Sequence, residues 1–158
     1  GHQDAIMRTD SVVSTIQTEG IILEKLSYQF ANWNRGQAEN KMTQLINRYG
    51  TDIELVISNN DEMALGAAAA YDALGYPQDS RPVILGIDGL DSALEAVKKG
   101  YIQGTVYNDK EGQASRISGL ALSLFLGGVL PDSDFENGRY IFLPYHKVTE
   151  DNVDEFLK

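Results

Sequence analysis

The chain has 158 residues, 42% of them hydrophobic, and this composition is typical of one globular domain with a buried core. No apolar run approaches the roughly 18 to 20 residues that a membrane-spanning helix needs. The 13 basic and 23 acidic residues give a formal net charge of -10, which repels phosphate backbones and anionic membrane surfaces. We therefore expect no nucleic-acid partner.

The first part of the chain predicts a helix, a strand and a second helix. Apolar residues at helical spacing indicate a helix over residues 3–19, and the string IILEKLSY, which begins at residue 21, has a strand pattern. Residues 35–48 form the second predicted helix. Its inward-facing residues are expected to be Met42, Leu45 and Ile46.

Strands and helices then alternate at short intervals. The predicted strands cover residues 53–58, 82–87 and 102–106, and the predicted helices cover residues 60–74, 91–99 and 110–127. This alternation favours right-handed βαβ units and a mostly parallel sheet. We assign the α/β class, doubly wound rather than a barrel, because there are too few units to close a barrel.

The end of the chain is predicted to hold a loop, a strand and a short helix. Residues 128–139 are rich in Gly, Asp, Asn and Pro and indicate a loop. The string YIFLPY predicts a strand over residues 140–145 that Pro144 ends. Thr149 and the acidic residues after it suit the start of a short terminal helix.

Three predicted strands run directly into Asn or Asp. LVISNND ends on Asn60 and Asp61, VILGIDG contains Asp88, and GTVYND ends on Asn108 and Asp109. In an open parallel sheet the carboxyl ends of the strands line the ligand crevice, so these side chains are expected to converge. They indicate a small, neutral, polar ligand.

Further polar residues could join this set. His2, Asp4 and Arg8 lie at the start of the first predicted helix, and Trp33, the only tryptophan, lies in the polar loop FANWNRGQ. Carboxylates and amides hydrogen-bond vicinal hydroxyls, Arg donates as a planar fork, and an aromatic face packs on the C–H face of a sugar ring. The mixture suits a neutral sugar.

Each of these residues also has a purely structural interpretation. Asn60, Asp61 and Asp88 could be helix N-caps, and Asn108 could be a turn former. Asp4 and Arg8 could form a solvated surface pair, Trp33 could belong to the core, and His2 could simply be exposed. These alternatives stay open for each residue taken alone, whereas three converging strand ends are harder to explain structurally.

Catalytic patterns are few. His2 and His146 are the only histidines and lie far apart in the sequence, and no nucleophile elbow, Walker loop, Rossmann fingerprint or HExxH string is present. Asp4 and Asp88 could be a glycosidase pair, but Arg8 would keep Asp4 ionised. We expect a binding protein rather than an enzyme.

At these residues the sequence resembles the C-terminal half of the periplasmic galactose/glucose-binding proteins, the substrate-binding components of sugar ABC transporters. The resemblance is carried by GHQDAIMR, FANWNRGQAENKM, IELVISNNDEMALGA, VILGIDGLDSALEAVKKG, GTVYNDKEGQA and LPYHKVTEDNVDEF, which extend along the whole chain. It implies the C-terminal lobe of the type I periplasmic-binding-protein fold, in incomplete form. Ribose-binding proteins and the effector domains of LacI-type repressors are less specific relatives.

The resemblance implies a binding site for glucose or galactose. The position of Trp33 implies stacking on the pyranose, while the other residues would hydrogen-bond its hydroxyls. An ABC permease, and in some members a chemoreceptor, would be the protein partner, and the location would be periplasmic or extracytoplasmic, including a membrane-tethered lipoprotein. The implied sugar ligands are His2, Asp4, Arg8, Trp33, Asn60, Asp88 and Asn108.

The family is about twice as long as this chain and includes an N-terminal lobe. By resemblance, residues 1–108 form the sugar-binding C-terminal lobe, 109–139 belong to the other lobe, and 140–158 return to the C-terminal lobe as a strand and a helix. The apolar helix in the middle segment would then lack its sheet. We expect it to dock on a second copy or on a complementary N-terminal fragment.

Calcium is the cofactor that the resemblance implies for the intact protein. Glu54 matches the distant carboxylate of the family's calcium site, but the upstream loop that supplies the other oxygens is not in this chain. Calcium takes six to eight oxygen ligands, so we expect no cofactor in this fragment unless that loop is supplied. The alternative function is the effector-binding domain of a LacI-type transcription regulator.

Overall fold

The computed structural model describes residues 2–128 and 135–157, and its chain divides into two compact units. The first comprises Gly1–Val106 and Lys147–Lys158, and the second comprises Tyr107–His146. Among the described residues, no helix combines the length and apolar character needed to cross a bilayer. The predicted assignment of residues 109–139 to the other lobe of the family fold stays a prediction.

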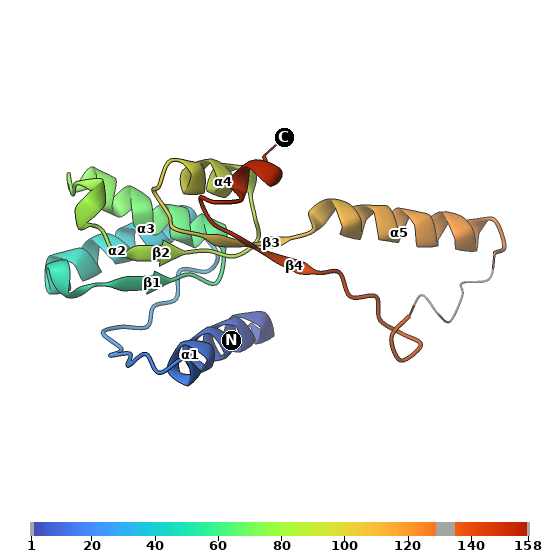
Figure 1. Ribbon diagram of the computed structural model, residues 1–158, viewed down its shortest axis with the longest axis horizontal. Coiled ribbons are helices and arrows are strands. Elements are labelled where there is room, and N and C mark those ends of the chain that lie inside the picture. The colour runs from blue at the N-terminus through green and yellow to red at the C-terminus, as the bar shows by residue number, and fades with distance from the viewer. Residues whose placement is uncertain (1, 129–134, 158) are drawn as a thin grey trace. The chain divides into compact units, whose positions relative to one another are not determined.

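A parallel sheet forms the centre of the first unit (Figure 1). Strand β1 (Leu55–Ile57) pairs in parallel with β2 (Val83–Leu85). A parallel bridge between Leu85 and Gly104 then leads toward β3 (Thr105–Asn108), and the hydrogen bond from the Asp88 N–H to the Val106 carbonyl, at 2.9 Å, continues that connection. The predicted α/β class with a parallel sheet is confirmed.

Strand β4 (Tyr145–Val148) pairs with β3. Each of these two strands has residues in both units, so β3 takes the chain out of the first unit and β4 brings it back. Because the strands are paired, the two connections lie side by side.

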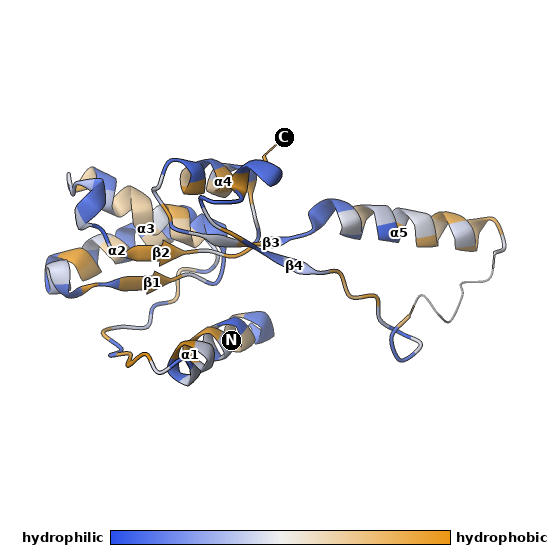
Figure 2. Ribbon diagram, in the orientation of Figure 1, coloured by the Kyte–Doolittle hydropathy of each residue, from blue (hydrophilic) through white to orange (hydrophobic). Residues whose placement is uncertain are grey.

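The helices of the first unit supply most of its core. They are α2 (Arg35–Tyr49), α3 (Asp61–Ala73) and α4 (Asp91–Lys98), and Figure 2 shows apolar residues on β1, β2 and α4. Helix α3 is rich in alanine, so α2 can approach it closely. Residues with at most 1% exposure include Ala64, Ala70, Tyr71, Ile84, Ala93, Leu94, Val97, Ile102 and Val148, together with the carboxylate residue Asp61.

The helix boundaries agree closely with the predictions. Helix α1 (Gln3–Thr18) and α5 (Lys110–Phe125) also form where expected, although neither has a buried residue. In α2, Met42 and Ile46 are buried as predicted, whereas Leu45 is half-buried. In the part of the chain that the structure describes, short 3-10 helices cover Gly50–Asp52, Gln78–Ser80 and Val153–Glu155.

The strand predicted from residue 21 is wrong. Residues 21–30 have no regular secondary structure, and the side chain of Ile22 is 96% exposed. A strand is stabilised by the ladder it forms with a neighbour, and this segment pairs with none of the described strands. An alternating apolar pattern alone is therefore not sufficient to make this segment a strand.

Two predictions near the C-terminus also need correction. The strand expected over residues 140–145 starts only at Tyr145, directly after Pro144, so the proline precedes the strand instead of ending it. Proline has no N–H to donate to a ladder and fits before a strand. The predicted terminal helix is a single 3-10 turn, Val153–Glu155. Part of the predicted loop, residues 129–134, lies outside the described residues.

The second unit consists of α5 and the segment that returns to β4. None of its described residues is buried. Ile117, Leu122 and Leu124 on α5 are 67%, 58% and 59% exposed, and Phe142 in the returning segment is 71% exposed. The apolar residues of this unit are thus largely uncovered.

Gly66 permits the close contact between α2 and α3, and this yields a first prediction. A Cβ at Gly66 would overlap the carbonyl oxygen of Arg35. Because that oxygen belongs to the backbone, Gly66→Ala is expected to lower the free energy of unfolding by about 1 to 3 kcal/mol in urea denaturation. The matched control, Gly36→Ala on α2, meets only Asn34 at an ordinary 3.6 Å. Equal stabilities of the two variants would contradict this account.

Candidate functional site

The buried carboxylate of Asp61 joins three segments at the strand ends. Its Oδ1 accepts a hydrogen bond from the Thr105 hydroxyl at 2.6 Å, and its Oδ2 accepts one from the Leu90 N–H at 2.8 Å. The Asp61 N–H donates to the Ile87 carbonyl at 2.8 Å. A Cβ at Gly86 would overlap Oδ1, so a glycine is needed there for the carboxylate to enter.

The pKa of Asp61 is raised because burial disfavours its charged form. Hydrogen bonds from Thr105, Leu90 and Gly89 lower the pKa in the opposite direction, and they offset only part of the effect of burial. With all of these donors inside the fold, Asp61 has a structural role. Asn60, the residue before it, is the N-cap of α3, and the Asn60 Oδ1 accepts a hydrogen bond from the Met63 N–H at 3.0 Å.

Asp88 follows β2 in an unusual backbone conformation. Its φ angle is +130°, a region that non-glycine residues rarely occupy and that is found mainly at functional positions. The N-cap of α4 is Leu90, so Asp88 is not a cap. Its Oδ1 lies 3.5 Å from Nη1 of Arg8. Burial raises the pKa of Asp88, and the nearby Arg8 opposes that change.

Trp33 also has a left-handed backbone, with a φ of +61°, and Asn32 before it has a φ of +50°. The His2 ring meets the Trp33 ring edge-on at a centroid distance of 5.3 Å, and the Arg8 guanidinium carbon lies 6.0 Å from the indole centroid. The Asn60 amide donates to the Trp33 carbonyl at 3.4 Å. Trp33 is half-buried rather than part of the core.

The first unit brings six of the seven predicted sugar ligands into one connected group. Asp4 lies 3.9 Å from His2, which contacts Trp33, and Trp33 leads to Arg8. Arg8 pairs with Asp88 rather than with Asp4. The members are His2, Asp4, Arg8, Trp33, Asn60 and Asp88. Their role as sugar ligands stays a prediction.

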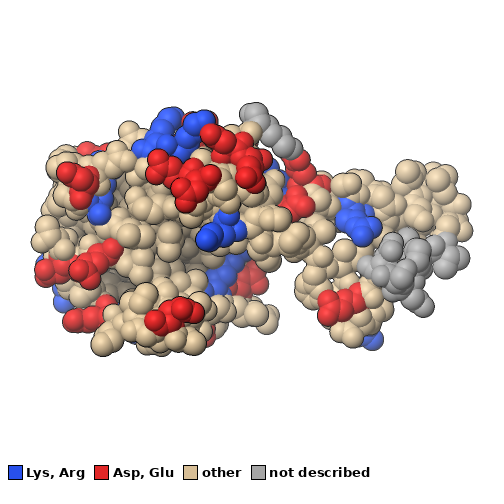
Figure 3. All heavy atoms as spheres, in the orientation of Figure 1, with Lys and Arg blue, Asp and Glu red and all other residues tan. Residues whose placement is uncertain are grey.

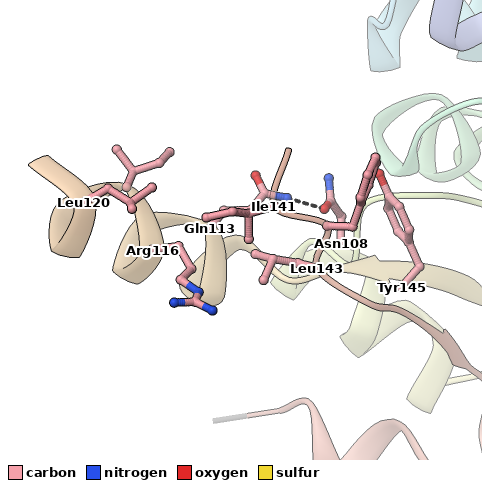
Figure 4. Close-up of a pocket in the computed structure, with 9 residues that line it drawn as sticks. Asn108, Gln113, Arg116, Leu120, Ile141, Leu143 and Tyr145 are labelled. Carbon is pink, nitrogen blue, oxygen red and sulfur yellow. Dashed lines mark hydrogen bonds between the residues drawn. The ribbon is translucent and has the colours of Figure 1, made fainter. Parts of the chain in front are cut away.

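Asn108, the seventh predicted ligand, lies in the second unit. Its Oδ1 accepts a hydrogen bond from Nε2 of Gln113, which Figure 4 shows as a dashed line. Both residues line a hollow of about 360 Å³ beside α5, together with Ile141, Leu143 and other apolar side chains. The joining of Asn108 to the other six residues stays a prediction.

Two residues near the group were not identified from the sequence. The Asn59 carbonyl accepts a hydrogen bond from Arg8 Nη1 at 2.7 Å, and the Asn59 side chain pairs with Thr9. Asn59 could have been found from its position next to Asn60 at the end of a strand. Thr9 gives no sequence signal, because an isolated threonine in a helix is common.

Metal binding has little support from the described residues, which contain no group of three or more His, Cys, Asp or Glu able to hold an ion. Glu54 is exposed, and its carbonyl accepts from the Val83 N–H in the sheet. One carboxylate does not fit a calcium site by itself. Its part in a calcium site therefore stays a prediction for a longer chain.

Charged residues on the face drawn in Figure 3 gather over α4 and the C-terminal segment. Two ion pairs lie there, Lys98 with Asp154 at 2.7 Å and Lys99 with Glu95 at 3.2 Å. All four side chains are at least half exposed, so these pairs contribute little to stability. They do not belong to the six-residue group.

The raised pKa of Asp61 predicts a pH-dependent stability. Well below pH 3.8, the ordinary aspartate pKa, the Asp61 carboxyl is neutral in the folded and the unfolded chain, and its contribution to the free energy of unfolding is complete. As pH rises through the raised folded pKa, the unfolded chain has already lost its proton, so the contribution is lost. Asp61→Asn cannot ionise, and its stability relative to the unaltered chain is expected to increase from pH 4 to pH 7, by about 1.4 kcal/mol for each unit by which the folded pKa exceeds 3.8.

Urea denaturation at several pH values checks this expectation. The exposed Asp10→Asn on α1 is the matched control, because it removes a carboxylate without a buried network. A constant stability difference between Asp61→Asn and the unaltered chain across that pH range would contradict the assignment.

Comparison with known proteins identifies similar chains along most of this sequence. A family model described as "Periplasmic binding protein domain" matches residues 1–128. The D-galactose/methyl-galactoside binding periplasmic protein of Haemophilus influenzae is 36% identical and matches 100% of this chain and 47% of its own length. A putative rhizopine-binding protein of Rhizobium meliloti is 39% identical over 98% of this chain and 48% of its own length.

A solved structure supports the fold. The ABC transporter solute binding protein of Bacillus halodurans with bound myo-inositol superposes with a TM-score of 0.80 at 34% identity, covering 99% of this chain and 50% of that one. The chain thus spans about half the length of the relatives it matches. The predicted type I fold, present as an incomplete part, is confirmed, and the family is one of binding proteins rather than enzymes.

Proposed function

The chain belongs to the periplasmic binding protein domain family, and from this premise we propose that it forms one wall of a sugar-binding cleft in the solute-binding component of an ABC transporter. The observation that carries the proposal is the connected group of Asp4, His2, Trp33, Arg8 and Asp88. It combines carboxylates, a guanidinium and one aromatic ring, which together recognise the hydroxyls and the C–H face of a sugar.

The backbone strain in this group supports a binding role. Trp33 and Asp88 both have positive φ angles, which lower the stability of the fold. Glycine would adopt the same angles without this cost. A structural role alone would not require tryptophan or aspartate at these positions. Strain retained at two contacting partners of Arg8 is consistent with side chains kept for a ligand.

Glucose or galactose is the ligand that we propose. The relative from Haemophilus influenzae is named for D-galactose, which supports this choice. The Rhizobium meliloti relative is named for rhizopine and the Bacillus halodurans structure holds myo-inositol, so the shared chemistry is a ring bearing several hydroxyls. These ligands serve as competitors in the test below.

The proposed partner of the intact protein is an ABC permease, and a chemoreceptor is a second proposed partner. The proposed location of the intact protein is the periplasm, or the outer face of the membrane if a lipid anchors it there. The family description and the relative named as periplasmic support this location. Closure of two lobes on the sugar would be the signal that the permease reads. The LacI-type alternative has no comparable support, because the relatives reported above are named as binding proteins.

Calorimetric titration of this chain with D-galactose and D-glucose tests the ligand. We expect binding weaker than micromolar, because half a cleft lacks the opposing wall and the exclusion of water that strengthens hydrogen bonds. Asp88→Asn is expected to reduce affinity about tenfold, since a charge-assisted hydrogen bond contributes about 1.5 kcal/mol or more. Competition by myo-inositol measures how selective the site is.

The matched control is Asp154→Asn, an exposed aspartate paired with Lys98 on another part of the first unit. It is expected to leave sugar affinity unchanged. No heat of binding with any of the three ligands at millimolar concentration would refute the proposed function, and submicromolar affinity would show that the second wall is not needed.

A complementary N-terminal fragment or a second copy of the chain is the proposed partner of the second unit. The side chains of Ile117, Leu122, Leu124 and Phe125 on α5 are more than half exposed, and residues 117–125 carry no charge. A patch of this kind favours association. Sedimentation velocity is expected to show self-association that increases with concentration, and Leu122→Glu should reduce it. A compact monomer at all concentrations, with no complex on addition of an N-terminal half, would contradict this proposal.

A further inference from the structure

Helix α1 carries Arg8 into the six-residue group, and its apolar packing is only partial: Val12, Val13 and Ile16 are half-buried. None of its residues is buried, and the side chains of Ile6 and Met7 are 51% and 60% exposed. Residues 21–30, which follow α1, have no regular secondary structure. Because no residue of α1 is fully buried, its polar contacts with the rest of the unit contribute substantially to its position.

The contacts of α1 with the end of β1 converge on Asn59. Arg8 Nη1 donates to the Asn59 carbonyl at 2.7 Å. One residue further along α1, the Thr9 hydroxyl accepts from the Asn59 amide at 2.9 Å and can donate to the Asn59 Oδ1, which is 3.3 Å away. The hydrogen bond from Arg8 to the Asn59 carbonyl and the one from the Asn59 amide to the Thr9 hydroxyl are partly buried. Water therefore competes with them less than at an open surface.

We propose that Thr9 and Asn59 are positioning residues, which hold α1 against the strand end and so direct Arg8 toward Asp88 and Trp33. Asn59 directly precedes Asn60, the N-cap of α3, and the β1–α3 connection is in turn fixed by the buried Asp61. Through this pair, the position of the strand end helps to determine where α1 lies. As a statement about sugar affinity, this inference rests on the proposed function.

The consequence for the site follows from the geometry of Arg8. Its guanidinium lies 3.5 Å from Asp88 Oδ1 and 6.0 Å from the Trp33 ring, and both distances depend on where α1 lies. Loss of the Thr9–Asn59 pair leaves only the Arg8 contact with the Asn59 carbonyl at this strand end. Arg8 would then occupy a wider range of positions, and a ligand would have to restrict it on binding.

Thr9→Val tests the proposal, because valine keeps the shape of threonine and removes the hydroxyl. Hydrogen exchange of the α1 amides is expected to become about fivefold faster, the effect of one hydrogen bond of about 1 kcal/mol. Galactose affinity should fall by a similar factor. Thr18→Val is the matched control on the same helix, since the Thr18 hydroxyl bonds only to the Ser14 carbonyl one turn earlier.

Four further tests separate positioning from general stability. Thr9→Ser retains the hydroxyl and should restore both exchange and affinity, and Asn59→Ala combined with Thr9→Val should cost no more than either change alone. Exchange of the α3 amides should stay unchanged in all variants. The fluorescence of Trp33, the only tryptophan, should shift in Thr9→Val without any ligand, because Arg8 and His2 lie against its ring.

The outcomes distinguish this inference from the proposed function. If the unaltered chain binds no sugar, the proposed function fails, and exchange and fluorescence still test whether the pair positions α1. Equal exchange in Thr9→Val and Thr18→Val would overturn the positioning role. Faster exchange with unchanged galactose affinity would show that the pair holds α1 but does not serve the sugar site.

Discussion

A carboxylate with almost no access to water determines how the strand ends of the first unit meet. Asp61 accepts hydrogen bonds from Thr105 at β3 and from the Leu90 N–H before α4, while its own N–H donates to Ile87 after β2. Burying this group costs free energy, and the donors around it recover part of that cost. In return, segments far apart in the sequence are held together.

The six-residue group is assembled on this foundation. Asn60 caps α3 beside Asp61, and Asp88 comes one residue after Ile87, whose carbonyl Asp61 fixes. Trp33 comes from the loop before α2, and Arg8 comes from helix α1. Rigid strand ends therefore supply two of the six members, Asn60 and Asp88. The other four come from the start of α1 and the loop before α2, which polar contacts attach to the strand ends.

Sequence periodicity was sufficient for the elements that pack on one another. The helices from α2 to α4 and the ends of β1 and β2 lie where the pattern places them, because their apolar faces meet within the same unit. The segment from residue 21 has the same kind of pattern and forms no strand, since pairing depends on a neighbour that the pattern does not reveal. The late start of β4 after Pro144 has a similar origin.

The candidate site could be predicted as a set of residues but not as a set of contacts. Strand ends identified Asn60 and Asp88, and the polar loop around the only tryptophan added Trp33. Nothing in the sequence indicates that Arg8 pairs with Asp88 instead of Asp4, or that Asp88 adopts a positive φ. Both depend on the tertiary position of α1 and of the turn after β2.

The left-handed backbone at Trp33 and Asp88 places fold stability and ligand recognition in opposition. Glycine at either position would relieve the strain and make folding more favourable, while deleting an aromatic face or a carboxylate. Selection for thermal stability alone should therefore replace Trp33 and Asp88 early. Selection for ligand binding should retain them and yield variants with lower melting temperatures. Thermostable descendants that still bind would need to compensate elsewhere, and the uncovered apolar residues of α5 offer room for such changes.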